Sequence, residues 1–300
     1  MNFRVISLKP VSESGRKGIL PGLALPVSVV TLAFFSATLK PVFAADSGAL
    51  FQTTRPVSGY TVPISSAPSA PVSPLSPIAY DAPQSPHQLI RTNDALRIER
   101  GKPNIIVAVI DTGIDANHPS LSANIWRDPQ STNYGWNFVK NQPNPTDENG
   151  HGTHVAGIMT GIAQKISIMP IKYYSENNSG NQNLKNAIQA IYFAISHGAK
   201  IINYSGGGPS FSQEEYEAFQ LAESRGILVV AAAGNDHHNT DLKENYYYPS
   251  AYRAFGLTNI ITVAATDLEN RLLPSSNWGK QYVDVAAPGE RILSCFQNNT

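Results

Sequence analysis

The sequence predicts an α/β fold in which a mainly parallel sheet is covered by helices on both faces. Short apolar runs alternate with longer stretches of helical spacing from about residue 89 onward. The runs are apolar throughout instead of alternating with polar residues, which is typical of parallel strands buried on both faces. Alternation of strand and helix along the chain favours right-handed crossovers. The expected strands are residues 105–110, 166–171, 201–202, 227–232 and 260–264.

The first expected helix follows the second of these strands. Leu184, Ile188, Ile191 and Ile195 recur at intervals of four, three and four residues. Side chains at this spacing share one face of a helix. Gly198 follows directly and can adopt the left-handed conformation that ends a helix.

A second helix is expected after Ser212. Ser212 and Glu215 have the spacing of a capping box, in which each side chain bonds the backbone N–H of the other residue. Gly226 is expected to close this helix.

Binding groups in parallel sheets gather at the carboxyl ends of strands. Asp111 directly follows the first apolar run, so it lies where a functional site is expected.

The N-terminal residues have the pattern of an export signal. Basic residues occur within residues 1–18, residues 19–39 are almost wholly apolar, and Val42-Phe43-Ala44 offers small residues for cleavage. We expect residues 1–44 to be a signal peptide and the protein to be secreted or periplasmic. The alternative is a retained signal anchor, and we expect membrane contact only in that case.

Residues 45–88 form an expected Pro/Ser-rich linker, because prolines are frequent and no apolar period is present. The globular domain is expected at residues 89–300.

The formal net charge of the chain is zero, so no nucleic-acid partner is expected. The single cysteine, Cys295, cannot form an intrachain disulfide, and we expect a small residue near the end of a strand instead of a catalytic thiol.

Asp111 and His151 are the candidate catalytic pair. A buried carboxylate can hold the tautomer of an imidazole and stabilise its protonated form. Alone, Asp111 could equally be a strand-end cap bonding nearby amides. Asp111-Thr112-Gly113 also occurs in aspartic proteases, but those need two carboxylates sharing a proton, and the sequence has one such motif.

Residues 109–115 (Val-Ile-Asp-Thr-Gly-Ile-Asp) and 150–157 (Gly-His-Gly-Thr-His-Val-Ala-Gly) together resemble the motifs of subtilisin-like serine peptidases. The resemblance implies a three-layer αβα sandwich, here missing its C-terminal part. It implies that Asp111 orients His151, that His151 is the general base, and that Asn235 in Ala232-Ala233-Gly234-Asn235 donates to the oxyanion.

The resemblance also implies the edges of a substrate cleft. Ser205, Gly206 and Gly207 would line one side of the primary specificity pocket, and Asn178, Ser179 and Gly180 would form the opposite edge. A peptide could pair with such edges by strand addition. Without the resemblance, both segments are simply two flexible loops.

One part of the family pattern is missing. The nucleophile of such peptidases stands in a Gly-Thr-Ser motif, which residues 1–300 do not contain. Ser205, Ser210, Ser275 and Ser294 lack the required neighbours. We therefore expect a serine endopeptidase acting on protein or peptide substrates, with its nucleophile beyond Thr300 and the chain as given inactive. A non-catalytic peptide-binding pseudoprotease, or a truncated gene product, is the alternative.

No cofactor and no metal site are predicted. His154 lies three residues after His151, but no third ligand follows at metal spacing, so we expect His154 to serve in packing. Calcium needs six to eight oxygen ligands. The loop that would supply them in relatives with a tight calcium site is absent after Ile162, and Ser120 stands where those relatives have an aspartate.

Overall fold

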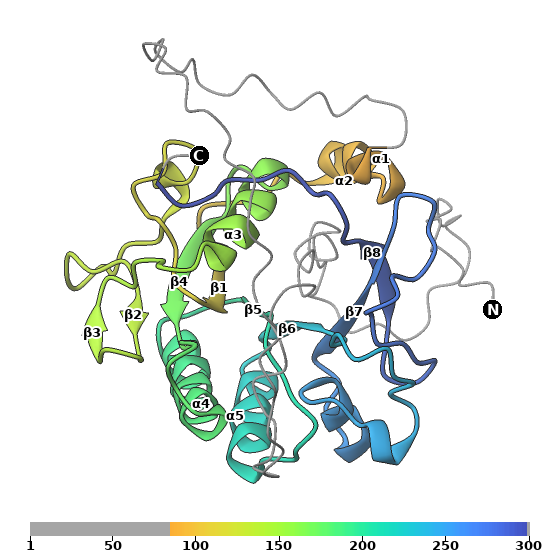
Figure 1. The fold of residues 1–300 in the computed structure, drawn as a ribbon. Coiled ribbons are helices and arrows are strands. Elements are labelled where there is room, and N and C mark those ends of the chain that lie inside the picture. The colour runs from red at the N-terminus through yellow and green to blue at the C-terminus, as the bar shows by residue number, and fades with distance from the viewer. Residues whose placement is uncertain (1–84, 299–300) are drawn as a thin grey trace, which may run out of the picture.

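A computed structural model describes residues 85–298 of the protein (Figure 1). Its centre is an eight-stranded sheet of order β3-β2-β4-β1-β5-β6-β7-β8, in which only β2 and β3 are antiparallel neighbours. The strands are β1 (Ile106–Asp111), β2 (Trp136–Asn137), β3 (Gln142–Pro143), β4 (Ser167–Lys172), β5 (Ile201–Tyr204), β6 (Leu228–Ala232), β7 (Ile260–Thr266) and β8 (Val285–Pro288). The helices are α1 (Pro86–Leu89), α2 (Thr92–Ile98), α3 (His151–Ile162), α4 (Gly180–Ser196) and α5 (Gln213–Ser224), with short 3₁₀ turns η2 (Ser122–Asn124), η3 (Lys243–Asn245) and η4 (Ser250–Phe255).

The five strands expected from the sequence are present, with their ends shifted by a residue or two, and they pair in parallel. Strand order reverses at β1, which lies between β4 and β5. Such reversal points are where open α/β sheets form their sites. The sequence did not indicate β2, β3 or β8, because two to four residues are too few to show a period.

Two hydrophobic cores lie on opposite faces of the sheet. Ala108 and Ile110 of β1 face the core that α4 and α5 cover, whereas Val107 and Val109 face the core that α3 covers. Figure 1 shows these three layers, with α3 above the sheet and α4 and α5 below it. The alternation explains why β1 is apolar at every position.

Both expected helices form. Ser179 caps α4 by accepting a hydrogen bond from the Gln182 N–H, and Gly198 after its end has a positive φ of 78°. Helix α5 follows Ser212, whose hydroxyl accepts from the Glu215 N–H at 3.3 Å, and Gly226 has a φ of 67°. The other half of the expected capping box does not form, because the Glu215 side chain is turned into the core.

A short helix precedes the first strand. Helix α1 starts at Pro86, three residues before the expected boundary at 89, since Ser85 caps it and proline suits its first turn. The expected signal peptide and all but the last residues of the expected linker lie outside the described residues. Within residues 85–298, no helix combines the length and the apolar character needed to cross a bilayer.

Glu215 is buried among hydroxyl groups. Its carboxyl oxygens lie 3.1 Å from the Tyr204 hydroxyl and 2.8 Å from the Tyr252 hydroxyl. The Tyr252 hydroxyl also lies 3.0 Å from the Ser212 carbonyl oxygen. A phenol has one proton and cannot donate to both acceptors. In its protonated form Glu215 can donate to the Tyr252 hydroxyl, which then donates to the Ser212 carbonyl. Burial raises the pKa of Glu215 to about 7, and the hydrogen bonds that Tyr252 and Tyr204 donate to the ionised carboxylate partly oppose this rise.

Replacing Glu215 by glutamine should weaken the pH dependence of stability. Because the pKa rises from 4.5 to about 7 on folding, the folded protein keeps a proton that the unfolded chain releases between these values. The free energy of unfolding therefore falls as pH rises from 4.5. The loss is complete above pH 7 and amounts to about 3 kcal/mol. Urea unfolding at pH 5 and pH 8 should show a smaller difference for Glu215→Gln than for the unsubstituted protein.

Glu214→Gln is the matched control, because Glu214 is the exposed neighbour on the same turn. It should leave the difference between pH 5 and pH 8 unchanged. An equal difference in the unsubstituted protein and in Glu215→Gln would show that Glu215 is already ionised in the folded state.

Candidate active site

Asp111 and His151 meet at the carboxyl end of β1. Asp111 ends this strand and is 1% exposed, and His151 is the first residue of α3 and 7% exposed. The His151 Nδ1 and Asp111 Oδ1 atoms lie 2.7 Å apart, and the Thr112 N–H donates to the same oxygen at 2.8 Å. This is the pairing expected from the sequence. It leaves Nε2 as the ring nitrogen that faces away from the carboxylate.

A glycine lets the start of α3 approach the end of β1. A Cβ atom at Gly152 would collide with the Gly113 carbonyl oxygen and lie 3.2 Å from the Asp111 Cβ atom. The Gly152 N–H instead donates to the Thr112 hydroxyl at 3.0 Å. The small residue beside the histidine therefore serves the close packing of helix on strand, as the sequence indicated.

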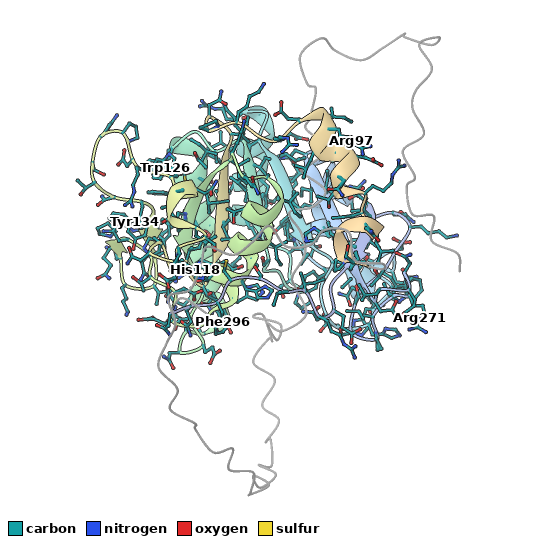
Figure 2. All side chains as sticks on the ribbon, turned by 90° about the horizontal axis from the view of Figure 1, so that it is seen from above. Arg97, His118, Trp126, Tyr134, Arg271 and Phe296 are labelled. Carbon is teal, nitrogen blue, oxygen red and sulfur yellow. The ribbon has the colours of Figure 1, made fainter. Side chains whose placement is uncertain are left out.

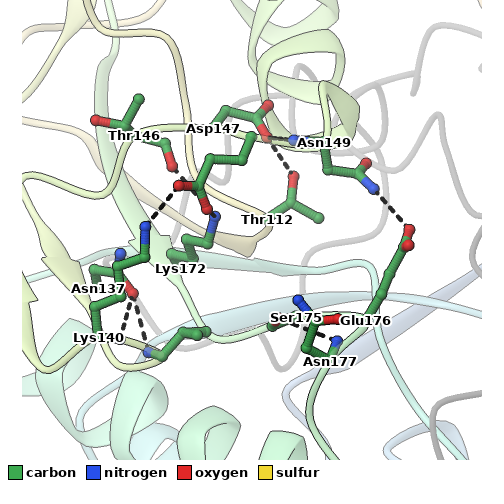
Figure 3. Close-up of polar contacts among 12 residues, drawn as sticks. Thr112, Asn137, Lys140, Thr146, Asp147, Asn149, Lys172, Ser175, Glu176 and Asn177 are labelled. Carbon is green, nitrogen blue, oxygen red and sulfur yellow. Dashed lines mark hydrogen bonds and ion pairs between the residues drawn. The ribbon is translucent and has the colours of Figure 1, made fainter.

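Asp147 holds the start of α3 in place through hydrogen bonds to the preceding loop and to the first turn of the helix (Figure 3). Its Oδ1 accepts from the Thr112 hydroxyl and from the N–H groups of Asn149 and Gly150. Its Oδ2 accepts from both the N–H and the hydroxyl of Thr153, at 3.0 and 2.6 Å. A buried negative charge at a helix N-terminus is favourable, so Asp147 supplies the cap that Gly150 cannot.

The loop before α3 is also tied to β4 (Figure 3). Lys172, the last residue of β4, lies 3.0 Å from a carboxyl oxygen of Glu148, and Lys140 lies 2.6 Å from the other. Hydrogen bonds from Lys140 and Lys172 lower the pKa of Glu148 to about 2. Glu148 therefore stays ionised and gives the buried Lys172 ammonium an opposite charge.

Asn235 lies in the bend after β6, half-buried, directly after Gly234. Asn277, 1% exposed, organises this bend. Its Nδ2 donates to the Ala233 carbonyl and its N–H donates to the Gly234 carbonyl. Its Oδ1 accepts from the N–H groups of Asp236 and His238, both at 2.9 Å. The backbone on both sides of Asn235 is thus held by one side chain.

The expected substrate edges follow β5 and β4, the two strands on either side of β1. Ser205, Gly206 and Gly207 directly follow β5, and Ser179 and Gly180 form the cap and first residue of α4 in the connection after β4. Because β4, β1, β5 and β6 are parallel neighbours, these segments, Asp111 and the Asn235 bend lie at the same edge of the sheet.

Sequence reasoning missed Asp147 and Asn277. An acidic residue shortly before a helix start is a usable signal for Asp147. Asn277 has no local signal, since its partners at 233–238 are about forty residues away in the chain.

The segment after β8 crosses α3. The Ser294 hydroxyl donates to the His154 carbonyl at 2.7 Å, and a Cβ atom at Gly157 would lie 2.9 Å from the Cys295 Cβ atom. Cys295 is buried against α3 and is not part of a strand. Figure 2 labels Phe296 in this segment, whose ring lies against Gly150. His154 packs here too, with Nε2 3.2 Å from the Ile292 carbonyl oxygen.

No group of three or more His, Cys, Asp or Glu side chains within residues 85–298 is placed to hold a metal ion. Burial lowers the pKa of His154, which favours its neutral form beside His151.

A family model described as the subtilase family matches residues 102–300. The thermophilic serine proteinase of Bacillus sp. (strain AK1) is 35% identical over 218 residues, covering 69% of this chain and 49% of that protein. The major intracellular serine protease of Bacillus subtilis (strain 168) is 37% identical over 213 residues, covering 66% of this chain and 62% of that protein. The chain thus spans about half to three fifths of the length of these relatives.

Among solved structures, a lanthipeptide protease is similar to this chain with a TM-score of 0.55 and 31% sequence identity, over 67% of this chain and 59% of that one. The likeness confirms the expected subtilisin-like α/β fold with a mainly parallel sheet.

Replacing Asp147 by asparagine should loosen the start of α3. The amide nitrogen cannot accept, so N–H and hydroxyl donors that now share a carboxylate lose partners. Because hydrogen bonds to charged groups contribute about 1.5–3 kcal/mol each, the free energy of unfolding should fall by about 3 kcal/mol. Amide hydrogen exchange at Gly150 and Thr153 should become faster.

Glu176→Gln is the control for Asp147→Asn. Glu176 is an exposed carboxylate that contacts the same loop at Asn149, and its loss should change stability by no more than about 0.5 kcal/mol. Equal effects of the two substitutions would contradict the anchoring role of Asp147.

Proposed function

The chain belongs to the subtilase family, and we propose that it is the part of a serine endopeptidase that carries the aspartate and histidine of the catalytic triad. The observation that supports this most directly is the buried 2.7 Å contact between His151 Nδ1 and Asp111 Oδ1. A carboxylate at this distance fixes the tautomer in which Nδ1 carries the proton and Nε2 is the nitrogen that can accept one.

In the proposed reaction, His151 takes the proton of a serine hydroxyl through Nε2 as that hydroxyl attacks the peptide carbonyl. Asp111 stays ionised and stabilises the imidazolium that results. The Asn235 side-chain amide donates to the oxyanion that forms, and His151 then returns the proton to the leaving amine. Asn277 supports this donor by holding the backbone on both sides of it.

The nucleophile in this proposal comes from sequence beyond Thr300. Residues 1–300 contain no Gly-Thr-Ser motif. Two of the serines considered from the sequence have structural bonds instead. The Ser205 hydroxyl accepts from the Asn203 amide at 3.1 Å, and the Ser294 hydroxyl donates to the His154 carbonyl at 2.7 Å. Loss of the nucleophile costs the related enzyme subtilisin roughly a millionfold in turnover.

The proposed substrate is a protein or peptide in extended conformation. Ser205, Gly206 and Gly207 on one side, and Ser179 and Gly180 on the other, would pair with its backbone as added strands. The two relatives described above are named as a serine proteinase and a serine protease, which supports a protein or peptide as the substrate.

Export is a further part of the proposal, and it rests on the sequence of residues 1–44 alone: the basic start, the apolar stretch and Val42-Phe43-Ala44. A relative named as an intracellular protease shows that membership of the family does not decide this point. N-terminal sequencing of the mature protein tests cleavage after residue 44.

Labelling with an organofluorophosphonate tests the catalytic proposal. The 300-residue chain should not react. A chain extended through the reading frame that follows Thr300 should react at one serine, and His151→Ala in the extended chain should abolish labelling because the base is lost. Asp111→Asn should slow labelling by roughly ten-thousandfold, by analogy with other triads.

Ser294→Ala is the control. It should not affect labelling of the extended chain. Labelling of the 300-residue chain would show that it already contains the nucleophile. A stop codon directly after Thr300, in a chain that binds peptides without cleaving them, would favour the peptide-binding pseudoprotease instead.

A further inference from the structure

We propose that Tyr247 closes the primary side-chain pocket of the substrate cleft and restricts the residue on the acyl side of the cleaved bond to glycine or alanine. The inference rests on the proposed function, since it names the substrate class of the same cleft. Its basis is the space that the glycines of this cleft leave open and the side chain that fills it.

The geometry of the cleft determines where that substrate side chain goes. The substrate backbone pairs beside Ser205–Gly207, and the attacked carbonyl must reach the Asn235 side chain. These segments follow β5 and β6, which are adjacent parallel strands. The side chain on the residue that carries this carbonyl therefore enters between the segment after β5 and the segment after β6.

Tyr247 occupies this gap. A Cβ atom at Gly207 would lie 2.5 Å from Cε1 of the Tyr247 ring, and a Cβ atom at Gly234 would lie 3.0 Å from Cε2. Opposite edges of one ring thus face the two glycines, so the ring extends from one wall to the other. Tyr247 is only 8% exposed, so its ring is enclosed between the walls.

The backbone holds Tyr247 in this place. Gly208 and Tyr248 form an antiparallel bridge, with N–H to carbonyl distances of 3.0 and 2.8 Å in the two directions. This bridge joins the segment that carries the tyrosine to the glycine-rich edge. Burial, and then the negative charge of Asp236, raise the pKa of Tyr247, so the phenol is neutral at neutral pH.

A second tyrosine prevents the pocket from widening toward β4. The Tyr173 hydroxyl lies where a side chain at Gly206 would be, and Tyr173 is 1% exposed. Tyr173 follows β4, and its N–H donates to the Asp111 carbonyl at 3.0 Å, so it is fixed to the catalytic strand. A large substrate side chain would have to displace one of two packed rings.

Equilibrium binding to the 300-residue chain tests this proposal without a cleavage step. The probes are fluorescein-Ser-Ser-Ser-Xaa peptides with a free C-terminal carboxylate, which takes the position of the attacked carbonyl at Asn235. Xaa is Gly, Ala, Val, Leu or Phe, and the readout is fluorescence anisotropy. The Ala peptide should bind at least about tenfold more tightly than the Phe peptide, since pocket size discriminates by factors of this order.

Variants at residue 247 locate the cause. Tyr247→Gly should remove the preference for Ala or reverse it in favour of Phe, by about tenfold or more. Tyr247→Phe keeps the ring and should keep the preference for Ala. Tyr246→Gly is the neighbouring control, because the Tyr246 ring packs against Tyr282. It should also keep the preference.

Each outcome decides a different point. If the Ala and Phe peptides bind the unsubstituted chain with equal affinity, the role of Tyr247 is overturned and the proposed function stays intact. Absence of binding by every peptide overturns the proposed substrate cleft and this inference together. Because the peptide series on the unsubstituted chain is decisive alone, a Tyr247→Gly protein that fails to fold does not prevent the test.

Discussion

The hydrogen bond between Asp111 and His151 requires that the end of a strand and the start of a helix nearly touch. Helices normally pack on sheets through their side chains, at a distance that would separate these two groups. Here the side chain is removed at Gly152, and the freed helix N–H bonds the Thr112 hydroxyl. Much of the surrounding polar structure, from Asp147 to the Lys172 ion pair, holds this close approach in place.

The buried polar side chains near the site differ in how many of their acceptor atoms are hydrogen-bonded. Asp147 and Asn277 have their acceptors occupied by backbone donors of nearby turns, so each fixes the path of a loop beside the site. Asp111 is different. Its Oδ1 accepts two hydrogen bonds, but Oδ2 is buried without a hydrogen-bond partner among the described residues. A carboxylate that is not fully satisfied remains a strong acceptor, which suits the role proposed for Asp111 in stabilising a protonated imidazole.

Much of this arrangement could be predicted from the sequence, and the rest depends on contacts between distant residues. The parallel strands and the pairing of Asp111 with His151 follow from apolar runs and from two local motifs. The capping box at Ser212 was only half right, because tertiary contacts from Tyr204 and Tyr252 draw Glu215 inward. Asn277 and Tyr247 lie in stretches without periodicity. Their importance arises from strands and turns that only the folded chain brings beside them.

The division of the interior into two cores has a consequence for engineering. The layer formed by α4 and α5 is separated from the layer that contains α3 by the full thickness of the sheet. Substitutions well apart and without shared partners usually have additive effects on stability. Stabilising changes on the α4 and α5 layer should therefore add to changes on the α3 layer, and they leave the geometry around His151 as it is.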